Sequence, residues 1–358
     1  MDDVRRLNIG VLGLDRRGHV LLQAMAETAR INISAVADRD ILRAEKWAAR
    51  LNCTAFDDYR QFILNRDFDH LFVAANLHHC LEHVRLAVKS GCHVLKLAPM
   101  ARTFAEATEL YELSHTEGTN FDIVNPARAM PGFQAFRSLV PDGRMNRPFL
   151  VRLFAEVGLL AGLNPELLQI HPDTQTSWIT DQTLAGGGVL LHHCYQLIDQ
   201  LILAFGLPRQ VYALCQSHAS DRQQLHHLTE DTALVTLRFG ENLMVDLVAM
   251  RHWDDRPPRE TITLFDKEHQ VTIARDRLTV CNHQGDTIDK AKFKDDPVAV
   301  AKAVLDQYCD SREHPKEYPF GSDARANLNV MAVMEAAYLS ARTGTPEDPE
   351  RILERARV

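Results

Sequence analysis

The chain has 358 residues, of which 25% are charged and 46% are hydrophobic. This balance is typical of a globular protein, and the length allows two domains with separate cores. The formal net charge is −8, and no cluster of Lys and Arg offers a surface for phosphates, so a nucleic-acid partner is not expected. No apolar run is long enough to cross a membrane, and the first one is too short for a signal peptide.

The seven cysteines are scattered along the chain and form no CxxC pair. An odd number without metal-type or disulfide-type spacing indicates reduced thiols. We therefore expect a cytoplasmic protein without a disulfide framework.

The first predicted elements form a β-α-β unit. Leu7–Leu12 is a short aliphatic run, as expected of a strand that is buried on both faces. A turn with two glycines follows, and Arg17–Ala29 then has apolar residues at helical spacing. Ile31–Ala37 is a second buried strand. Its last residue is followed by an acid, Asp38.

The turn and the end of the second strand have the features of a dinucleotide site. Gly13 and Gly18 delimit the turn, and the free N–H groups of the following helix favour a pyrophosphate. Asp38 lies about 20 residues further on, where an acid would bond the ribose hydroxyls. Asp15 replaces the middle glycine, so its carboxylate must turn outward or pair with a neighbouring arginine such as Arg16. The alternative is a nucleotide-free α/β protein that uses this turn only for packing.

Helices and strands continue to alternate as far as residue 126. This spacing predicts a doubly wound parallel sheet, which is a Rossmann-type α/β domain over residues 1–126 with its ligand beyond the carboxyl ends of the strands. Thr103 and Glu106 form a predicted capping box. The predicted helices are Arg39–Leu51, Phe56–Leu64, His79–Ser90 and Thr103–Glu117, and the predicted strands are Asp69–Ala75, His93–Leu97 and Phe121–Val124.

From Pro148 the apolar residues recur with period two. This pattern predicts an α+β domain over residues 127–358, with a large, mostly antiparallel open sheet that helices cover on one face. Leu243–Arg251 is apolar on nearly both faces, so the other face needs a partner, and we expect a homodimer or homotetramer. The predicted strands are Phe149–Gly158, Gln210–Ser217, Thr232–Phe239, Leu243–Arg251, Thr261–Phe265, Val271–Ala274 and Leu278–Cys281, and the predicted helices are Val189–Phe205, Pro297–Tyr308 and Ser322–Thr343.

Several local strings occur together in an order that is typical of one family. They are Val36–Asp40, Ser90–Leu95, Gly143–Pro148, Trp178 with Gly186–Leu190, and Leu197–Asp199. Through these strings, nearly the whole chain resembles the Gfo/Idh/MocA family of nicotinamide-dependent oxidoreductases, which act mostly on sugars, inositols and related polyols. The resemblance implies a Rossmann domain followed by a domain for substrate binding and oligomerisation.

The resemblance also implies a cofactor site at the carboxyl ends of the first strands. Asp38 favours the free 2′-hydroxyl of NAD, whereas Arg39 could accept the 2′-phosphate of NADP, so both cofactors stay open. The implied cofactor-binding residues are Gly13, Leu14, Asp15, Arg16, Gly18, Asp38, Arg39, Ala75, Asn76, His79, Lys96 and Ala98.

The catalytic positions of the family are changed in this chain. Ala98 stands where family members have the Lys of Glu-Lys-Pro, and His192 and Gln196 stand where they have the Asp and His of an Asp-x-Gly-x-His helix. Ala75 and Asn76 replace a Thr-Pro pair. Transfer of the hydroxyl proton contributes about 10² to 10⁴ in rate. Neither Ala98 nor Gln196 can accept that proton.

Two nearby residues could replace the missing groups. Lys96 precedes Ala98 by two residues on a strand, so it points to the same side about 6.6 Å further back. His192 precedes Gln196 by one helical turn and shares its face. We therefore predict Lys96 and His192 as catalytic residues facing a common cleft. The alternative for Lys96 is an ordinary lysine at a strand end.

Substrate contacts are expected from four further positions. Arg128 has planar donors that suit a carboxylate or vicinal hydroxyls. Trp178 could form a wall for a sugar ring, although core packing is its ordinary role. Gln196 and His193 complete the set, with a packing role as the alternative for His193 because it faces another side of the helix.

Two His-His-Cys triplets, His78–Cys80 and His192–Cys194, are expected at the same cleft. Zinc could take one residue from each triplet and one more ligand. Adjacent residues cannot easily bind one ion together, and no metal is predicted.

These features leave three functions open. The first is an oxidoreductase of a sugar-like or polyol-like small molecule with an atypical active site. The second is a non-catalytic protein that senses a ligand or binds a partner on the same fold. The third is a metal-dependent hydrolase or lyase. Binding of NAD(H) or NADP(H) separates the first two, because a ligand of the native state raises the melting temperature.

Overall fold

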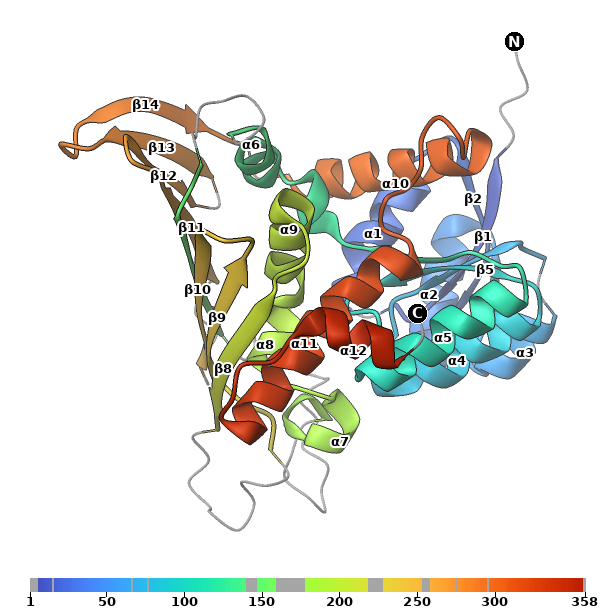
Figure 1. Cartoon of the computed structure of the whole chain (residues 1–358). Coiled ribbons are helices and arrows are strands. Elements are labelled where there is room, and N and C mark those ends of the chain that lie inside the picture. The colour runs from blue at the N-terminus through green and yellow to red at the C-terminus, as the bar shows by residue number, and fades with distance from the viewer. Residues whose placement is uncertain are drawn as a thin grey trace. The chain divides into compact units, whose positions relative to one another are not determined.

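The computed structural model divides the chain into two units (Figure 1). Unit 1 comprises Met1–Pro126 and Asp296–Leu328, and unit 2 comprises Ala127–Asp295 and Asn329–Val358. The first crossing between units lies at the boundary expected from the sequence, but residues 296–328 return to unit 1, contrary to the expected C-terminal domain of 127–358. The structure describes residues 6–14, 16–65, 67–75, 77–139, 147–158, 178–217, 228–252, 258–274, 276–294 and 296–356, without the side chains of residues 16 and 17.

Unit 1 is built on a six-stranded parallel sheet with the order β3-β2-β1-β4-β5-β6. The predicted doubly wound sheet is confirmed, and the strand order reverses between β1 and β4, where such folds bind their ligands. The strands are β1 (Leu7–Leu12), β2 (Ile31–Ala37), β3 (Thr54–Phe56), β4 (His70–Val73), β5 (His93–Leu97) and β6 (Phe121–Val124).

Helices pack on both faces of this sheet (Figure 1). They are α1 (Arg16–Ala26), α2 (Ile41–Leu51), α3 (Tyr59–Leu64), α4 (Leu77–Lys89), α5 (Phe104–Thr116) and α10 (Pro297–Glu313). Helix α10 packs against α1, and Arg30 binds Asp310 at 2.7 Å and Glu313 at 2.8 Å. These contacts explain why residues 296–328 belong to unit 1.

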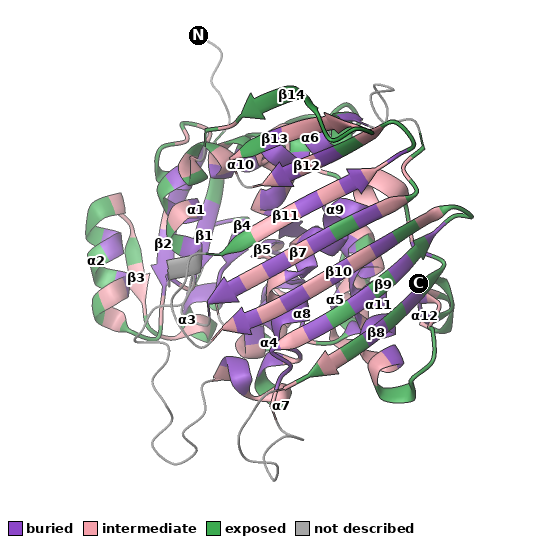
Figure 2. Cartoon of the chain, turned by 90° about the vertical axis from the view of Figure 1, so that its left-hand side faces the viewer, coloured by how far each residue is buried: buried purple, intermediate pink, exposed green. Residues whose placement is uncertain are grey.

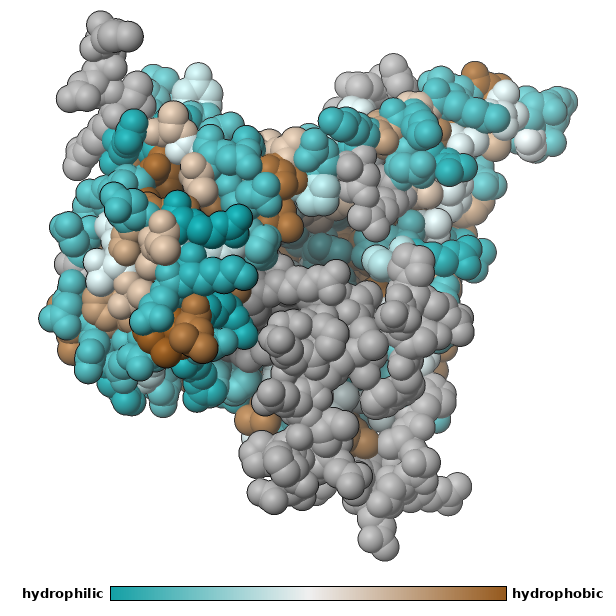
Figure 3. Space-filling model, turned by 180° about the vertical axis from the view of Figure 1, so that it is seen from behind, coloured by the Kyte–Doolittle hydropathy of each residue, from teal (hydrophilic) through white to brown (hydrophobic). Residues whose placement is uncertain are grey.

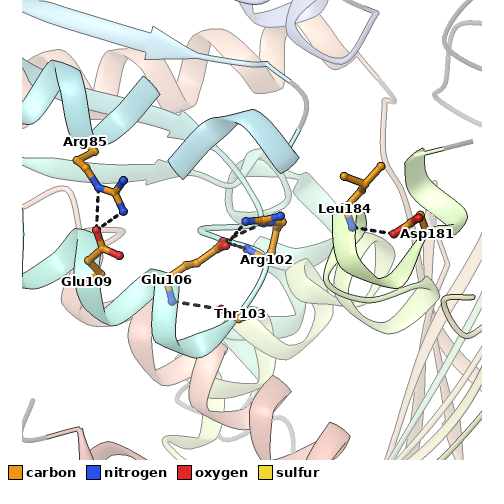
Figure 4. Close-up of polar contacts among 7 residues, drawn as sticks. All are labelled: Arg85, Arg102, Thr103, Glu106, Glu109, Asp181 and Leu184. Atoms are coloured by element: carbon orange, nitrogen blue, oxygen red, sulfur yellow. Dashed lines mark hydrogen bonds and ion pairs between the residues drawn. The ribbon is translucent and has the colours of Figure 1, made fainter. Parts of the chain in front are cut away.

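The ends of the helices follow local capping chemistry. Thr103 accepts the N–H of Glu106 at 3.2 Å at the start of α5, as the predicted capping box requires. The Glu106 carboxylate, however, accepts the N–H of Arg102 rather than that of Thr103, and it also binds the Arg102 guanidinium (Figure 4). Arg85 of α4 pairs with Glu109 of α5 at 2.5 Å, which ties the two helices together.

Unit 2 contains an eight-stranded sheet with the order β14-β13-β12-β11-β7-β10-β9-β8. Neighbouring strands are antiparallel except β7 and β10, which are parallel. The predicted mostly antiparallel sheet is confirmed. The strands are β7 (Leu150–Gly158), β8 (Gln210–Gln216), β9 (Thr232–Phe239), β10 (Leu243–His252), β11 (Arg259–Phe265), β12 (His269–Ala274), β13 (Arg277–Asn282) and β14 (Thr287–Lys292).

The helices of unit 2 cover one face of this sheet and leave the other face open (Figures 1 and 2). Along β9 and β10 the burial alternates, so every second side chain lies under the helices. The helices are α6 (Pro131–Leu139), α7 (Gln182–Ala185), α8 (Val189–His193), α9 (Tyr195–Phe205), α11 (Ala324–Thr343), which begins in unit 1, and α12 (Pro349–Arg355); η1 (Pro126–Ala129) and η3 (Trp178–Thr180) are 3₁₀ turns.

The predicted helix Val189–Phe205 is wrong in one respect, because it is divided into α8 and α9 at Cys194. The Cys194 N–H is shared between the carbonyls of Leu190 and Val189, at 3.1 and 3.2 Å. No helix among the described residues is long and apolar enough to span a bilayer.

Candidate functional site

The turn after β1 requires glycine at both of its ends. Gly13 has a φ of +92°, and a Cβ on it would lie 2.5 Å from the backbone nitrogen of Ala75. A Cβ on Gly18 would lie 2.7 Å from the Cβ of Ala74. The turn therefore packs directly on the segment that follows β4, at the reversal of strand order. Asp15, Asn76 and the side chain of Arg16 lie outside the described residues, so their predicted contacts with the cofactor stay predictions.

Asp38 lies at the end of β2 beside this turn. One carboxylate oxygen accepts the N–H of Leu14 at 2.9 Å, and the other accepts the N–H of Asp40 at 3.0 Å. Arg43, at the start of α2, approaches the same carboxylate at 3.3 Å, whereas Arg39 is exposed. Arg43 is not among the residues expected from the sequence, although an arginine one turn beyond the Asp40 cap of α2 is a signal for such a contact.

A group of histidines occupies the first turns of α4. The rings of His78 and His79 lie 3.8 Å apart, and those of His79 and His83 lie 6.0 Å apart. Burial, reinforced by nearby positive charge, lowers the pKa of His78 to about 4, and burial also lowers the pKa of His83 to about 4. These two rings are therefore neutral at physiological pH. The next residue of the triplet, Cys80, is buried and donates to the carbonyl of Ala75.

The spacing of His79 and His83, four residues apart on a helix, is one that metal sites use, and the sequence analysis overlooked it. Among the described residues, however, no group of three or more His, Cys, Asp or Glu side chains is arranged to hold a metal ion.

Lys96 lies differently from the expectation that it points into the site. It is 2% exposed, and its ammonium donates to the carbonyl of Leu97 at 2.9 Å and to that of Pro99. The backbone oxygens at the end of β5 thus compensate the buried charge. An ammonium in this position stabilises the segment 97–99 and is poorly placed to carry a proton to a substrate. Ala98, in the same segment, is partly exposed.

In unit 2, the glycines before α8 allow a close approach to the start of β9. Glu230 accepts the N–H groups of Gly188 at 2.8 Å and Leu190 at 3.0 Å through its carboxylate. Tyr338 of α11 donates its hydroxyl to the same carboxylate at 3.0 Å. A Cβ on Gly188 would lie 1.8 Å from the carbonyl oxygen of Glu230. Glu230 is not among the residues expected from the sequence.

His192 is the last residue but one of α8. Its Nε2 lies 3.2 Å from the carbonyl oxygen of Ala185, and its ring lies edge-to-face with Trp178 at 5.8 Å. The ring is half-buried. The structure thus brings His192 and Trp178 together, which sequence spacing alone could not establish. Asp181 caps the intervening helix α7 through the N–H of Leu184 (Figure 4).

His193 and Gln196 lie on either side of the break at Cys194. The Gln196 amide donates to Glu260 of β11 at 3.2 Å. His192 lies on α8 and Gln196 on α9, rather than on the single helix that the sequence pattern predicts. The substrate contacts of these residues stay predictions.

Arg128 is engaged within unit 2. Its Nε and Nη2 donate to the two carboxylate oxygens of Asp199 on α9, at 2.7 and 2.5 Å. The side chains are 13% and 2% exposed. A bidentate pair of this kind is a strong charge-assisted contact, so the expected role of Arg128 in binding substrate competes with its contact to Asp199.

Comparison with known proteins agrees with the fold. Residues 7–123 match the family model described as an oxidoreductase family with an NAD-binding Rossmann fold, and residues 133–268 match the Gfo/Idh/MocA C-terminal domain. Together the two matches cover more than two thirds of the chain.

Among curated proteins, the chain is 28% identical over 193 residues to the dTDP-3,4-didehydro-2,6-dideoxy-alpha-D-glucose 3-reductase of Saccharopolyspora spinosa. It is 29% identical over 125 residues to the 1,5-anhydro-D-fructose reductase of Ensifer adhaerens. The matched stretches cover 52% and 35% of this chain. They span about half the length of the first relative (52%) and about a third of the second (34%).

Solved structures resemble the chain over nearly its whole length. An oxidoreductase from Agrobacterium radiobacter in complex with NAD⁺, L-tartaric acid and magnesium has a TM-score of 0.80 at 16% identity, over 97% of this chain and 100% of that one. A levoglucosan dehydrogenase in complex with NADH and levoglucosan has a TM-score of 0.80 at 17% identity, over 96% and 99%. At these identities the likeness concerns the fold, and together with the two matched family models it means that the chain belongs to the Gfo/Idh/MocA family of oxidoreductases.

Proposed function

We propose that this protein binds NAD(H) or NADP(H) in unit 1 and oxidises or reduces a sugar-like or polyol-like small molecule with an atypical set of proton-handling groups. The observation that carries the proposal is the glycine turn. Gly13 adopts a positive φ and leaves no room for a Cβ beside Ala75. Such a close backbone turn ahead of a helix N-terminus is what a pyrophosphate requires.

The residues that would hold the cofactor surround this turn and the neighbouring strand ends. Bound NAD(H) or NADP(H) would accept or supply the hydride. Asp38 supports NAD(H), because a carboxylate disfavours the 2′-phosphate of NADP(H), whereas Arg43 beside it reduces that penalty. The other described residues of the proposed site are Leu14, Arg39, Ala75, His79 and Lys96, with Ala98 directly after β5.

The proposed proton-handling group is His192. Imidazole is the side chain that most often serves as an acid or base near neutral pH. The ring contacts Trp178, and its Nε2 lies within hydrogen-bond distance of the carbonyl oxygen of Ala185. Lys96 is not part of the proposed proton transfer, because its ammonium is buried against two carbonyl oxygens.

The substrate class rests on the relatives. The curated relatives reduce a deoxysugar nucleotide and an anhydro sugar, and one of the similar structures is named for levoglucosan. In this chain, Trp178 would supply an apolar wall for a sugar ring, and Gln196 would supply an amide for a hydroxyl.

Cofactor titration followed by turnover assays tests this proposal. Saturating NAD(H) or NADP(H) should raise the melting temperature, since a ligand at 100 times its Kd stabilises the native state by about 2.7 kcal/mol. The Asp38→Asn variant should bind NADH more weakly. The control is Asp246→Asn, which changes a partly exposed carboxylate on the sheet of unit 2 and should bind NADH like the parent. No shift with either cofactor would overturn the nucleotide function.

Turnover on a panel of sugars, inositols and anhydro sugars then tests the chemistry. His192→Gln should abolish turnover and leave the Kd for NADH unchanged. A variant as active as the parent would remove His192 from the mechanism.

A second function, ligand binding without turnover, is favoured by one specific observation. The cationic groups expected at the active site are engaged by the protein itself, Lys96 with backbone oxygens and Arg128 with Asp199. A cofactor-dependent thermal shift without turnover on any substrate of the panel would favour this second function.

We also propose that the protein self-associates through the open face of the sheet in unit 2. Leu214, Leu234, Val248 and Phe154 are paired across four neighbouring strands and form an apolar row on that face. In unit 1, by contrast, the surface seen in Figure 3 is mostly hydrophilic with small, separate hydrophobic patches. An extended apolar row is the type of surface that a second copy would cover.

A further inference from the structure

We propose that Glu230 is a positioning residue that sets the place of His192 by anchoring the short helix α8. The inference rests on the proposed function of His192. It concerns a carboxylate that is 6% exposed and that the proposed chemistry does not otherwise use.

Helix α8 cannot hold its own position. It has five residues, and helices of this length are unstable without tertiary contacts. Its first N–H groups instead bond to one residue: Gly188 and Leu190 donate to the Glu230 carboxylate, and Val189 donates to the Glu230 carbonyl at 3.0 Å. A carboxylate at a helix N-terminus also interacts favourably with the helix dipole.

The contacts of Glu230 explain why the two residues before α8 are glycines. A Cβ on Gly187 would lie 2.0 Å from the hydroxyl of Tyr338, and one on Gly188 would lie 1.8 Å from the carbonyl oxygen of Glu230. Both groups belong to the same contact, because Tyr338 donates to Glu230 at 3.0 Å. Glycine at these positions therefore lets the helix approach its anchor.

The buried charge of Glu230 is compensated locally. Burial raises the pKa of Glu230, and the N–H groups of Leu190 and Gly188 and the Tyr338 hydroxyl oppose that rise. Arg251 of β10 lies nearby, 6% exposed, and donates to Thr229 at 3.0 Å. A carboxylate with three donors and a neighbouring guanidinium is a rigid support, since each donor loses its partner if the carboxylate moves.

The support reaches His192 through one further hydrogen bond. The His192 N–H donates to the carbonyl of Gly188 at 3.0 Å, and the Gly188 N–H donates to Glu230. His192 is thus one helical turn from the anchor. A displacement of about 1 Å in a catalytic group can cost about 10²-fold in rate, so loosening the anchor should affect chemistry before it affects substrate affinity.

The experiment compares Glu230→Gln and Tyr338→Phe with Val271→Ala, a core change in β12, which packs against β11, β13 and α6. In Glu230→Gln, one oxygen remains an acceptor but the amide nitrogen faces the Gly188 N–H. In Tyr338→Phe, one donor is removed and the ring is kept. The imidazole of His192 is followed by ¹⁵N NMR of histidine-labelled protein and assigned with His192→Gln.

We expect both anchor variants to shift the His192 ¹⁵N resonances and to change the midpoint of its titration. We also expect kcat to fall by about 10- to 100-fold, with KM and the Kd for NADH nearly unchanged. Val271→Ala should lower the melting temperature and leave the His192 resonances in place. If Glu230→Gln does not fold, Tyr338→Phe still tests the positioning role.

The positioning role is overturned if the anchor variants leave the His192 resonances and titration unchanged, or change them no more than Val271→Ala does. The NMR arm does not depend on turnover. If His192→Gln proves as active as the parent, the proposed chemistry fails, while the effect of Glu230 on the His192 ring is still measured.

Discussion

At the scale of single residues, Gly13 combines two requirements that could have been separate. Its φ of +92° lies in the region that favours glycine, and its missing Cβ makes room for Ala75. The first requirement concerns only the local backbone. The second concerns the packing of the turn on the end of β4, and hence the shape of the proposed pyrophosphate site.

Alanine substitution separates these two requirements. Gly118 also has a positive φ of +65°, but a Cβ on it would meet nothing within 4 Å. Gly118→Ala should therefore cost about 1 to 2 kcal/mol of unfolding free energy. Gly13→Ala should cost more, about 2 to 4 kcal/mol, because backbone strain and a steric clash add. Urea denaturation of the two variants checks this, and equal losses would mean that the turn has room for a side chain.

Lys96 and Asp38 mark the limit of sequence-based prediction at this scale. The alternation of a strand predicts that the side chains of Lys96 and Ala98 point to the same side. It does not indicate that the long side chain of Lys96 finds two carbonyl oxygens at the end of its own strand. Likewise, the sequence predicts that Asp38 lies at the cofactor site, but it does not predict the contact of Asp38 with the guanidinium of Arg43. That contact depends on where α2 begins.

Asp122 of β6 should make stability depend on pH. Burial raises its pKa to about 7, although Arg312 lies 3.6 Å away and opposes the rise, and the charge of Asp323 adds to it. The unfolded chain has a pKa near 3.9 at such a residue. The native state therefore holds this proton more tightly, and its contribution to stability is full below about pH 4 and is lost as the pH rises to about 7.

The Asp122→Asn variant provides the measurement. Because the amide resembles the protonated carboxyl, the melting temperature of the variant relative to the parent should increase from pH 5 to pH 8. This increase in relative melting temperature should end near pH 8, above the pKa of Asp122 in the parent. A constant difference across this range would show that Asp122 is ionised throughout in the native state.

At the scale of elements, strongly patterned segments were predicted and weakly patterned ones were missed. The buried strands of unit 1 are continuous apolar runs, so their positions follow from composition. The strand β14 has no buried residue, and therefore no apolar alternation to detect. The start of α8 bonds to Glu230, which lies 42 residues from Gly188 and 40 residues from Leu190, so no local pattern indicates this contact.

At the scale of the whole molecule, the fold class was predictable because many independent patterns agree on it. The alternation of strands and helices predicts the parallel sheet, and the change to period two near Pro148 predicts the second sheet. The return of residues 296–328 to unit 1 was not predictable, since the contacts that determine it, such as Arg30 with Asp310, join surface charges far apart in the chain.

The open sheet face leads to a prediction about assembly. Leu234 lies in the middle of the apolar row and is paired with Leu214 on one side and Val248 on the other. It is 44% exposed, and Leu214 is 53% exposed. In a self-associated protein, an aspartate at this position would place a charge in the middle of a buried interface without a partner, which is strongly unfavourable.

Leu234→Asp should therefore convert the protein to monomers, as measured by light scattering coupled to size-exclusion chromatography. Its control is Leu42→Asp on α2, where the leucine is 73% exposed on unit 1 and lies outside the proposed interface. This control should keep the oligomeric state of the parent. Because Leu234 already contacts solvent in the isolated chain, its replacement should leave the fold of each protomer intact, which circular dichroism checks. If Leu234→Asp elutes like the parent and Leu42→Asp does not, the interface lies on unit 1 and the open sheet face has another role.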